Sequence, residues 1–154
     1  MMRYWLMKSE PDEFSIDDLA RASRHGTPWF GVRNYQARNF MRDQMRVGDQ
    51  VLFYHSSCAE PGIAGVAEVC ANAHPDLTQF DPKSKYYDAK ATHEQPRWVN
   101  VDLRFVRKTR LLGLGELRQH PELAGMRLLA RGNRLSITPL DPREWKFITT
   151  KLLK

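Results

Sequence analysis

The stretch that decides the fold is QVLFYHSSCAEPGIAGVAEVCA, residues 50–71. Two apolar runs, 50–55 and 62–71, are rich in β-branched and aromatic residues and flank a short polar loop, which predicts two neighbouring strands. Gly62 and Gly65 lie in the second run. Glycine inside a strand is typical of a bulge or of close approach by another backbone. Such bends are what a sheet needs in order to close into a small barrel.

On either side of this region, three further apolar stretches predict strands at 3–7, 97–108 and 133–138. The stretch at 97–108 alternates apolar and polar residues and is the longest. Strands therefore dominate the middle of the chain, without the regular alternation of a parallel βαβ protein. The sequence predicts a mixed α/β (α+β) fold, with a bent, mostly antiparallel β-barrel surrounded by short helices.

Three short helices are predicted from their N-terminal signals. Ser15 with Asp18 resembles a capping box, and Asn34 is a suitable N-cap for a second helix. The last helix is expected to begin at Asp141, with Pro142 in its first position. Between the strands lies a polar stretch, 72–96, which is too long for a routine connection. Its aromatic residues Phe80, Tyr86 and Tyr87 indicate an ordered lid rather than a disordered linker.

Length and composition indicate one globular domain, residues 1–154, with 42% hydrophobic residues. The two cysteines, Cys58 and Cys70, do not form a disulfide framework and are typical of a reduced intracellular protein. The N-terminal residues have the pattern of neither a signal peptide nor a membrane span. We therefore expect a soluble, cytoplasmic monomer with no membrane partner.

The net charge of +6 is unevenly distributed. Residues 97–134 contain nine Lys and Arg, eight of them Arg, against three Asp and Glu, a local charge of +6. Arginine suits phosphate and base edges through its planar fork of donors. The charge favours a nucleic-acid partner, DNA or RNA, with a solvated basic surface as the alternative interpretation.

Signals for cofactors and metals are missing from the sequence. No GxGxxG follows the first strand, no GxxxxGK[ST] occurs, and no CxxC, HxH or HExxH accompanies the cysteines. We expect no cofactor and no metal. The carboxylates Glu10, Asp12 and Glu13, with His55 and Ser56, could support acid–base or nucleophilic chemistry. Adjacent strand residues point to opposite faces, so His55 cannot easily activate Ser56.

Several longer motifs carry a family resemblance. They are YWLMKSEP at 4–11, WFGVRNYQARNFMR at 29–42, GDQVLFYHS at 48–56, GIAGVAEV at 62–69, PDLTQFDPKSKYYD at 75–88, PRWVNVDL at 96–103 and RLSITPL at 134–140. Together they resemble the EVE-domain family over nearly the whole chain. The resemblance implies a PUA-like fold, similar to that of the YTH readers of methylated adenine. It also implies a reader of a modified base, with modified cytosine in DNA favoured.

The same resemblance implies a ligand site where three segments meet at the mouth of the barrel. Their residues are Lys8, Ser9 and Glu10; Trp29, Val32, Arg33, Asn34 and Tyr35; and His55, Ser56 and Ser57. A flipped base would stack on Trp29, with Tyr35 or an aromatic residue of the lid opposite. Core packing is the alternative for Trp29, and the N-cap role is the alternative for Asn34.

Other residues of this site are expected to contact polar atoms of the ligand. Arg33 is interpreted as a phosphate contact, and Ser56 and Ser57 as donors to a base carbonyl. Arg131, Arg134 and Ser136 would form a phosphate-facing rim. The leading hypothesis is a non-enzymatic nucleic-acid reader. The alternatives are a nucleic-acid hydrolase or base-processing enzyme using Glu10, His55 and Ser56, and a sensor of a small nucleoside-like ligand.

Overall fold

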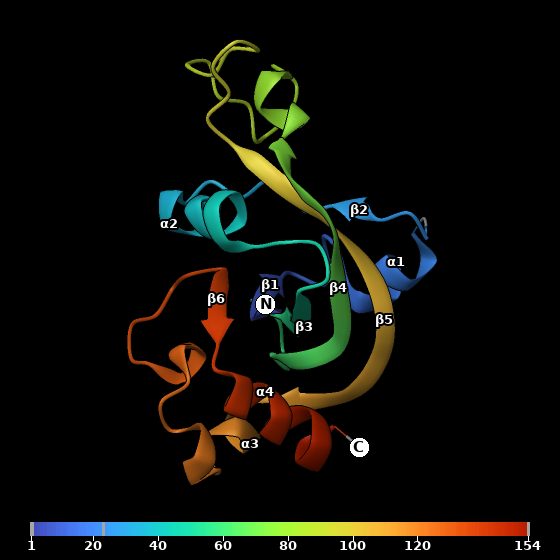
Figure 1. Cartoon of the computed structure of the whole chain (residues 1–154), viewed down its shortest axis with the longest axis vertical. Helices are drawn as coiled ribbons and strands as arrows, with labels where there is room; N and C mark the ends of the chain where they lie inside the picture. The colour runs from blue at the N-terminus through green and yellow to red at the C-terminus, as the bar shows by residue number, and fades with distance from the viewer. Residues whose placement is uncertain (1, 23, 154) are drawn as a thin grey trace.

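The computed structural model describes residues 2–22 and 24–153; of the expected domain 1–154, residues 1, 23 and 154 lie outside the described residues. Six strands form one mixed sheet in the order β2-β5-β4-β3-β1-β6. The strands are β1 (Tyr4–Ser9), β2 (Thr27–Pro28), β3 (Gln50–His55), β4 (Gly62–Pro75), β5 (Val99–Gly113) and β6 (Ile137–Leu140). In Figure 1, β4 and β5 run side by side through the height of the molecule and curve together at its lower end.

Short helices surround this sheet. They are α1 (Ile16–Arg21), α2 (Tyr35–Asn39), α3 (Leu114–Arg118) and α4 (Pro142–Phe147), with π-helical turns at Phe40–Gln44 and Ile148–Leu152 and 3₁₀ turns at Leu77–Phe80, Pro121–Leu123 and Arg127–Leu129. The N-terminal signals read from the sequence are confirmed. Ser15 and Asp18 form a capping box, the Asn34 side chain accepts from the Ala37 N–H, and Asp141 caps α4.

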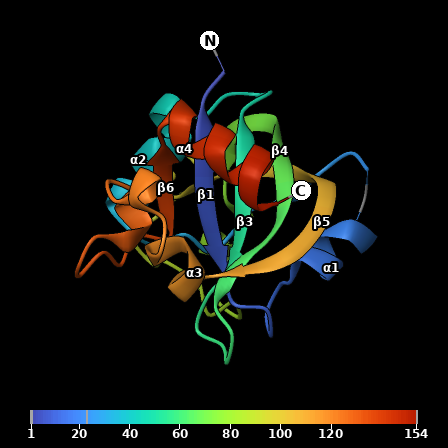
Figure 2. The same ribbon diagram turned by 90° about the horizontal axis from the view of Figure 1, so that it is seen from below.

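Apolar side chains cover both faces of the central strands. Trp5 and Met7 of β1 and Phe53 of β3 belong to one core, which α1 and α2 cover. The alternate residues Leu6 and Leu52 belong to a second core, covered by α3, α4 and the π-turn after it. Figure 2 shows α4 crossing in front of β1 and β3, with α1 beside the far edge of β5. The two-residue period of a strand thus divides one sheet between two cores.

The glycines of β4 allow close contact with β5, as expected from the sequence. A Cβ atom at Gly62 would lie 2.6 Å from the Leu112 carbonyl oxygen, and one at Gly65 would lie 2.5 Å from the Ile16 side chain. The β4–β5 register shifts between Ile63 and Gly65. Bulges at these points increase the local bend of the sheet.

The expected barrel is not confirmed, because the sheet does not close. In the described pairings β2 and β6 are the two edges, and no ladder joins them. The sheet is mostly antiparallel, as predicted, but β1 and β3 pair in parallel, with Ser9 opposite His55. The chain between them, containing α1, β2 and α2, is long enough for the crossover that parallel strands require.

Several strand boundaries differ from the sequence prediction. β4 continues to Pro75 and β5 to Gly113, so the irregular segment is 76–98 rather than 72–96. β6 begins at Ile137 and includes Pro139. Proline has no backbone N–H to donate, and an edge strand tolerates it because that strand has a neighbour on one side only. The segment 76–98 projects beyond the ends of β4 and β5 at the top of Figure 1.

Candidate nucleic-acid interface

The parallel pairing of β1 and β3 explains how distant residues come to share a site. Parallel strands end at the same edge of a sheet, and the Ser56 N–H donates to the Ser9 carbonyl at 3.0 Å. The start of β6 joins them, because the Lys8 N–H donates to the Ser136 carbonyl at 2.8 Å. The residues after β1, after β3 and before β6 therefore lie together.

At this edge lies a cleft of about 620 Å³. The residues that line it are Lys8, Ser9, Glu10, Glu13, Phe14, Thr27, Pro28, Trp29, Phe30, Gly31, Val32, Arg33, Asn34, Ser56, Ser57, Lys85, Tyr86, Arg134 and Ser136. This set includes eleven of the fourteen residues expected from the sequence; Tyr35, His55 and Arg131 are not part of it. We refer to it below as the β1–β3 cleft.

The segment 76–98 forms one wall of this cleft and is held by a buried carboxylate. Asp76, whose side chain is fully buried, accepts from the Gly31 N–H at 2.8 Å, from the Arg33 guanidinium at 3.1 Å and from the Thr78 N–H at 2.8 Å. Burial alone would raise the pKa of Asp76, but hydrogen bonds from Thr78, Gly31 and Arg33 outweigh it and lower the pKa. The lid expected from the sequence is therefore a fixed wall in this structure.

Arg33 positions this wall, and the phosphate contact expected for it does not fit its geometry. Its Nε and Nη2 atoms both donate to the Tyr86 carbonyl, at 3.1 and 2.7 Å, and Nη2 also donates to Thr78 Oγ1. Nη1 donates to the Val32 carbonyl and to Asp76. Every guanidinium nitrogen is thus occupied within the protein, which leaves little capacity for a phosphate.

The aromatic residues of the site are arranged differently from the expectation. Trp29 is only 8% exposed and packs edge-to-face against Phe53 at 5.4 Å, which matches the alternative of core packing. Tyr35 stacks on Trp98 outside the cleft, with the Arg38 guanidinium 4.7 Å from its ring centre. An aromatic residue of the 76–98 segment, the remaining possibility, does line the cleft: Tyr86 packs edge-to-face on Phe30 at 5.8 Å.

Several expected polar contacts already have partners within the protein. The Asn34 side-chain oxygen is used in the helix cap, and Ser9 Oγ donates to the Phe14 carbonyl at 2.6 Å. Ser57 lines the cleft with a φ of 53°, in the left-handed region that side chains other than glycine seldom adopt. Strained backbone of this kind often occurs at functional sites.

His55 contributes to structure rather than to the cleft. Its Nε2 atom accepts a hydrogen bond of 3.1 Å from the Ile16 N–H, in the first turn of α1. Burial lowers the pKa of His55; the nearby Asp17 carboxylate opposes this and Lys108 adds to it, and the net shift is downward, so the neutral form is favoured. Because this lone pair already accepts a hydrogen bond, His55 is not available as a general base. The geometry therefore argues against the hydrolase hypothesis, which needs His55 in that role.

The role of His55 predicts a pH dependence of stability. A His whose pKa is lowered by folding binds its proton first in the unfolded chain, so the free energy of unfolding falls as the pH drops below about 6.5. In His55→Gln, whose side-chain oxygen keeps an acceptor without titrating, that part of the decrease should disappear. The measurement is urea denaturation of both proteins between pH 5 and pH 8. Parallel stability profiles for the two proteins would contradict this role.

The arginines of the basic segment fall into two groups. On β5, Arg104 pairs with Glu68 at 2.9 Å and Arg110 with Glu116 at 2.7 Å. In contrast, the guanidinium groups of Arg127, Arg131 and Arg134 have no partner within residues 2–22 and 24–153. All three are exposed. Arg118 is also exposed and has no hydrogen bond or ion pair in the described residues. Of these four unpaired arginines, Arg134 lines the β1–β3 cleft.

Residues of the cleft that the sequence prediction left out include Phe14, Thr27 and Lys85. Lys85 and Glu13 form an ion pair that joins the 76–98 segment to the loop after β1. Gly31 has a φ of +85°, and a Cβ atom there would lie 2.7 Å from Tyr86 Cζ. The motif around Gly31 was visible in the sequence, but nothing local indicated that the Tyr86 ring would lie against it.

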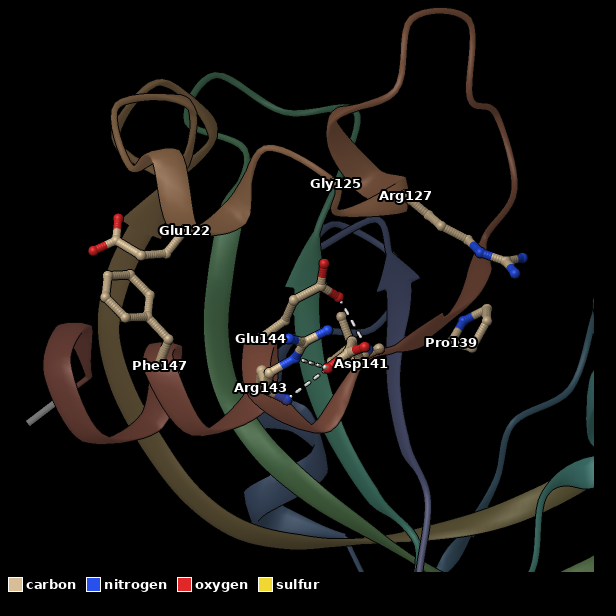
Figure 3. Close-up of a pocket in the computed structure, with 9 residues that line it drawn as sticks. Glu122, Gly125, Arg127, Pro139, Asp141, Arg143, Glu144 and Phe147 are labelled. Carbon is tan, nitrogen blue, oxygen red and sulfur yellow. Dashed lines mark hydrogen bonds and ion pairs between the residues drawn. The ribbon is translucent and has the colours of Figure 1, made fainter.

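A second, larger cleft of about 840 Å³ lies at the start of α4, where Figure 3 shows its lining residues. Asp141, Arg143 and Glu144 are bonded to one another there as parts of the helix cap. Arg127 extends away from that cluster. Because Glu122, Asp141 and Glu144 outnumber the two arginines, this cleft is less suited to a polyanion than the β1–β3 cleft.

In the part of the chain that the structure describes, no helix is both long and apolar enough to span a membrane. Within the same residues, no group of three or more His, Cys, Asp or Glu side chains is placed to hold a metal ion.

Known proteins include relatives of this chain. A family model described as the EVE domain matches residues 3–151. Thymocyte nuclear protein 1 of Gallus gallus is 44% identical over 163 residues, covering 94% of this chain and 66% of the chicken protein. Thymocyte nuclear protein 1 of Homo sapiens is 42% identical and covers 94% of this chain and 72% of the human protein. The chain thus spans about two thirds of these curated relatives.

Solved structures of related sequence share this fold. A protein from Pseudomonas putida is 52% identical, with a TM-score of 0.89, and the match covers 95% of this chain and 97% of that one. A crystal structure of human THYN1 protein in complex with 5-methylcytosine containing DNA is 41% identical, with a TM-score of 0.89 and 95% coverage of both chains.

Proposed function

This chain belongs to the EVE-domain family, and from this premise we propose that it is a non-enzymatic reader of DNA that takes up a modified cytosine in the β1–β3 cleft. The base would be flipped out of the helix, because inside a duplex its faces are covered by stacking and its pairing edge is occupied by the partner base. The human relative captured with 5-methylcytosine DNA, at a TM-score of 0.89, supports this assignment of the partner.

The observation that carries the proposal is the composition of the cleft. Its volume of about 620 Å³ is within the range of small-molecule sites, and it combines aromatic rings with polar groups. Phe30 is exposed and Tyr86 half-buried, so both can present ring surface to a base, and stacking contributes about 1–3 kcal/mol per base. That gain offsets the few kcal/mol needed to extrude the base. A methyl group adds about 0.8 kcal/mol when it is buried.

The phosphates beside the flipped base would meet Arg131 and Arg134, with Arg127 further along the same segment. These side chains carry no internal partner within the described residues, so binding a phosphate breaks no ion pair there. The arginines of β5 would first have to leave Glu68 or Glu116. Part of the excess charge seen in the sequence, at Arg131 and Arg134, would thus supply the phosphate-facing rim of the proposed site.

Binding to labelled oligonucleotides tests the proposal. The panel contains matched DNA duplexes with cytosine or 5-methylcytosine at one position, the RNA equivalents and the free nucleosides. We expect preference for the 5-methylcytosine duplex and affinity that falls as salt rises. A small-ligand sensor would instead bind the nucleosides with little dependence on salt. Absence of binding to every duplex at low salt would exclude the reader function.

The two groups of arginines give the matched control. The double variant Arg131→Ala/Arg134→Ala should weaken binding to all duplexes alike and flatten the slope of log K against log salt by about 0.9 for each phosphate that the protein no longer neutralises. Arg104→Ala/Arg110→Ala makes the same change in net charge at paired positions and should leave the slope near that of the unmodified protein. Equal effects of the two double variants would mean that only net charge matters.

A further inference from the structure

One polar group of the β1–β3 cleft is nearly buried and yet has no partner. Trp29 is 8% exposed, and its indole N–H makes no hydrogen bond within the described residues. In the same residues, the completely buried side-chain nitrogen or oxygen that lacks a partner is Thr138 Oγ1. The Trp29 N–H is therefore not sealed inside the protein, and Trp29 lines the cleft. A donor that reaches the cleft and has no partner in the described protein is available to hydrogen-bond a ligand there.

The same residue is a poor stacking surface. A stacked base covers most of one ring face, and a side chain that is only 8% exposed does not present one. Phe53 and Phe14 lie at 89° and 85° to the Trp29 ring, with centroids 5.4 and 6.5 Å away, and hold it in place. What Trp29 offers a ligand is its N–H in a fixed position, while Tyr86 and Phe30 offer ring surface.

Two more polar groups of the cleft are free while their neighbours are occupied. The half-buried Lys8 ammonium has no partner in the described chain, and burial lowers its pKa. Of the two carboxylates that line the cleft, Glu13 is paired with Lys85, whereas Glu10 has no side-chain partner in the described chain. Arg134 and the hydroxyls of Ser56, Ser57 and Ser136 also line the cleft without a side-chain partner in the described residues. Among the free groups, Trp29 and Lys8 offer two donors and Glu10 offers a carboxylate acceptor.

We propose that the β1–β3 cleft distinguishes cytosine from thymine by hydrogen bonds from Trp29 and Lys8 and to Glu10; this rests on the proposed function. The pairing edge of cytosine has one donor, the N4 amino group, and two acceptors, N3 and O2. Two protein donors and one carboxylate complement that pattern, and a carboxylate is a known partner of the cytosine amino group. Thymine places a carbonyl oxygen where cytosine has its amino group, so Glu10 would face another acceptor.

This comparison separates the edge of the base from its methyl group. 5-Methylcytosine and thymine carry the same 5-methyl group and differ in the pairing edge. Each is placed opposite an abasic site in otherwise identical DNA duplexes, so that neither base has to leave a base pair. The protein is expected to bind the 5-methylcytosine duplex at least about tenfold more tightly than the thymine duplex. This is the effect expected when a hydrogen bond made to one base is replaced by two acceptors facing each other in the other.

Variants assign the effect to its residues. Glu10→Gln can either accept or donate, so the ratio of the two dissociation constants should fall toward one, while binding to both duplexes persists. Trp29→Phe keeps a ring in the core and removes the N–H, and should weaken binding to the 5-methylcytosine duplex by about tenfold. Lys8→Met changes a half-buried position of the cleft and should also weaken binding to the 5-methylcytosine duplex. It therefore tests the proposal even if Trp29→Phe folds poorly.

The outcomes are distinguishable. Failure to bind either duplex would overturn the proposed function itself. Binding with equal affinity for 5-methylcytosine and thymine would leave the reader function standing and overturn this inference. An unchanged ratio in Glu10→Gln, or full affinity in both Trp29→Phe and Lys8→Met, would also overturn it.

Discussion

Replacing Arg33 with methionine is expected to lower the free energy of unfolding by about 3 kcal/mol, because it leaves the buried Asp76 carboxylate without its ion-pair partner. The Arg33 side chain is 22% exposed, which places the effect at the lower end of the range for buried pairs. The variant also loses both hydrogen bonds to the Tyr86 carbonyl, so the 76–98 wall should loosen. Chemical denaturation measures the first effect and amide hydrogen exchange across residues 76–98 the second.

A control and a double variant make this prediction specific. Arg143→Met removes an arginine whose side chain is 94% exposed, and should change stability by no more than a few tenths of a kcal/mol. Adding Asp76→Asn to Arg33→Met removes the unpaired charge, so the double variant should be less destabilised than the sum of the two single changes. If Arg33→Met keeps full stability and loses only DNA affinity, Arg33 is a phosphate contact after all.

Tyr86→Ala is expected to weaken binding to 5-methylcytosine DNA by about 1–3 kcal/mol, the contribution of one stacked base. Tyr86 lines the cleft, and its ring lies against Phe30 and against the backbone at Gly31. Because it sits in a segment outside both hydrophobic cores, the fold should persist. Titration of the labelled duplex, with thermal unfolding as a check on the fold, measures both effects.

The neighbouring residue provides a matched control for Tyr86. Tyr87 is 44% exposed and does not line the cleft, so Tyr87→Ala should bind with the affinity of the unmodified protein. Tyr86→Phe keeps the ring and should retain most of the affinity. Equal losses in Tyr86→Ala and Tyr87→Ala would show that the segment as a whole matters and that no single ring forms the stacking surface.

The strands of the centre and the helix starts could be predicted from the sequence because their signals are local. The alternation of Trp5, Leu6 and Met7, or of Val51 and Leu52, shows directly which residues share a face. Ser15 and Asn34 likewise act on N–H groups only three residues away. Signals of this range are contained in any short window of sequence.

The outer parts of the long strands were missed for a related reason. Beyond Ala71, β4 carries Asn72 and His74, and the last part of β5 carries Thr109 and Arg110. The end of β4 pairs with the start of β5, with His74 opposite Asn100, and the end of β5 pairs with the start of β4, with Leu112 opposite Ile63. Polar residues interrupt the hydrophobic alternation in both ends, so it does not mark them. Closure into a barrel could not be decided from the sequence either. It depends on whether the edge strands β2 and β6 meet, and no local sequence preference determines that.

For the site, the sequence located the segments but not the roles within them. Arg33, Trp29 and His55 lie in or beside the expected region, yet their partners Asp76, Phe53 and Ile16 are 43, 24 and 39 residues away along the chain. Whether a side chain faces a ligand or a neighbour depends on such distant partners. The family resemblance conveyed which segments converge, and only the fold shows which groups in them remain free.

The arrangement of β6 beside β1 has a consequence for how the protein is made. Lys8 leaves the ribosome early, whereas Arg134 and Ser136 appear more than a hundred residues later, and the strand that follows them completes the edge of the sheet. Contacts so far apart in sequence form late in folding. A nascent chain therefore cannot complete the β1–β3 cleft until translation has passed Leu140, and a product that ends before residue 134 lacks this side of the cleft.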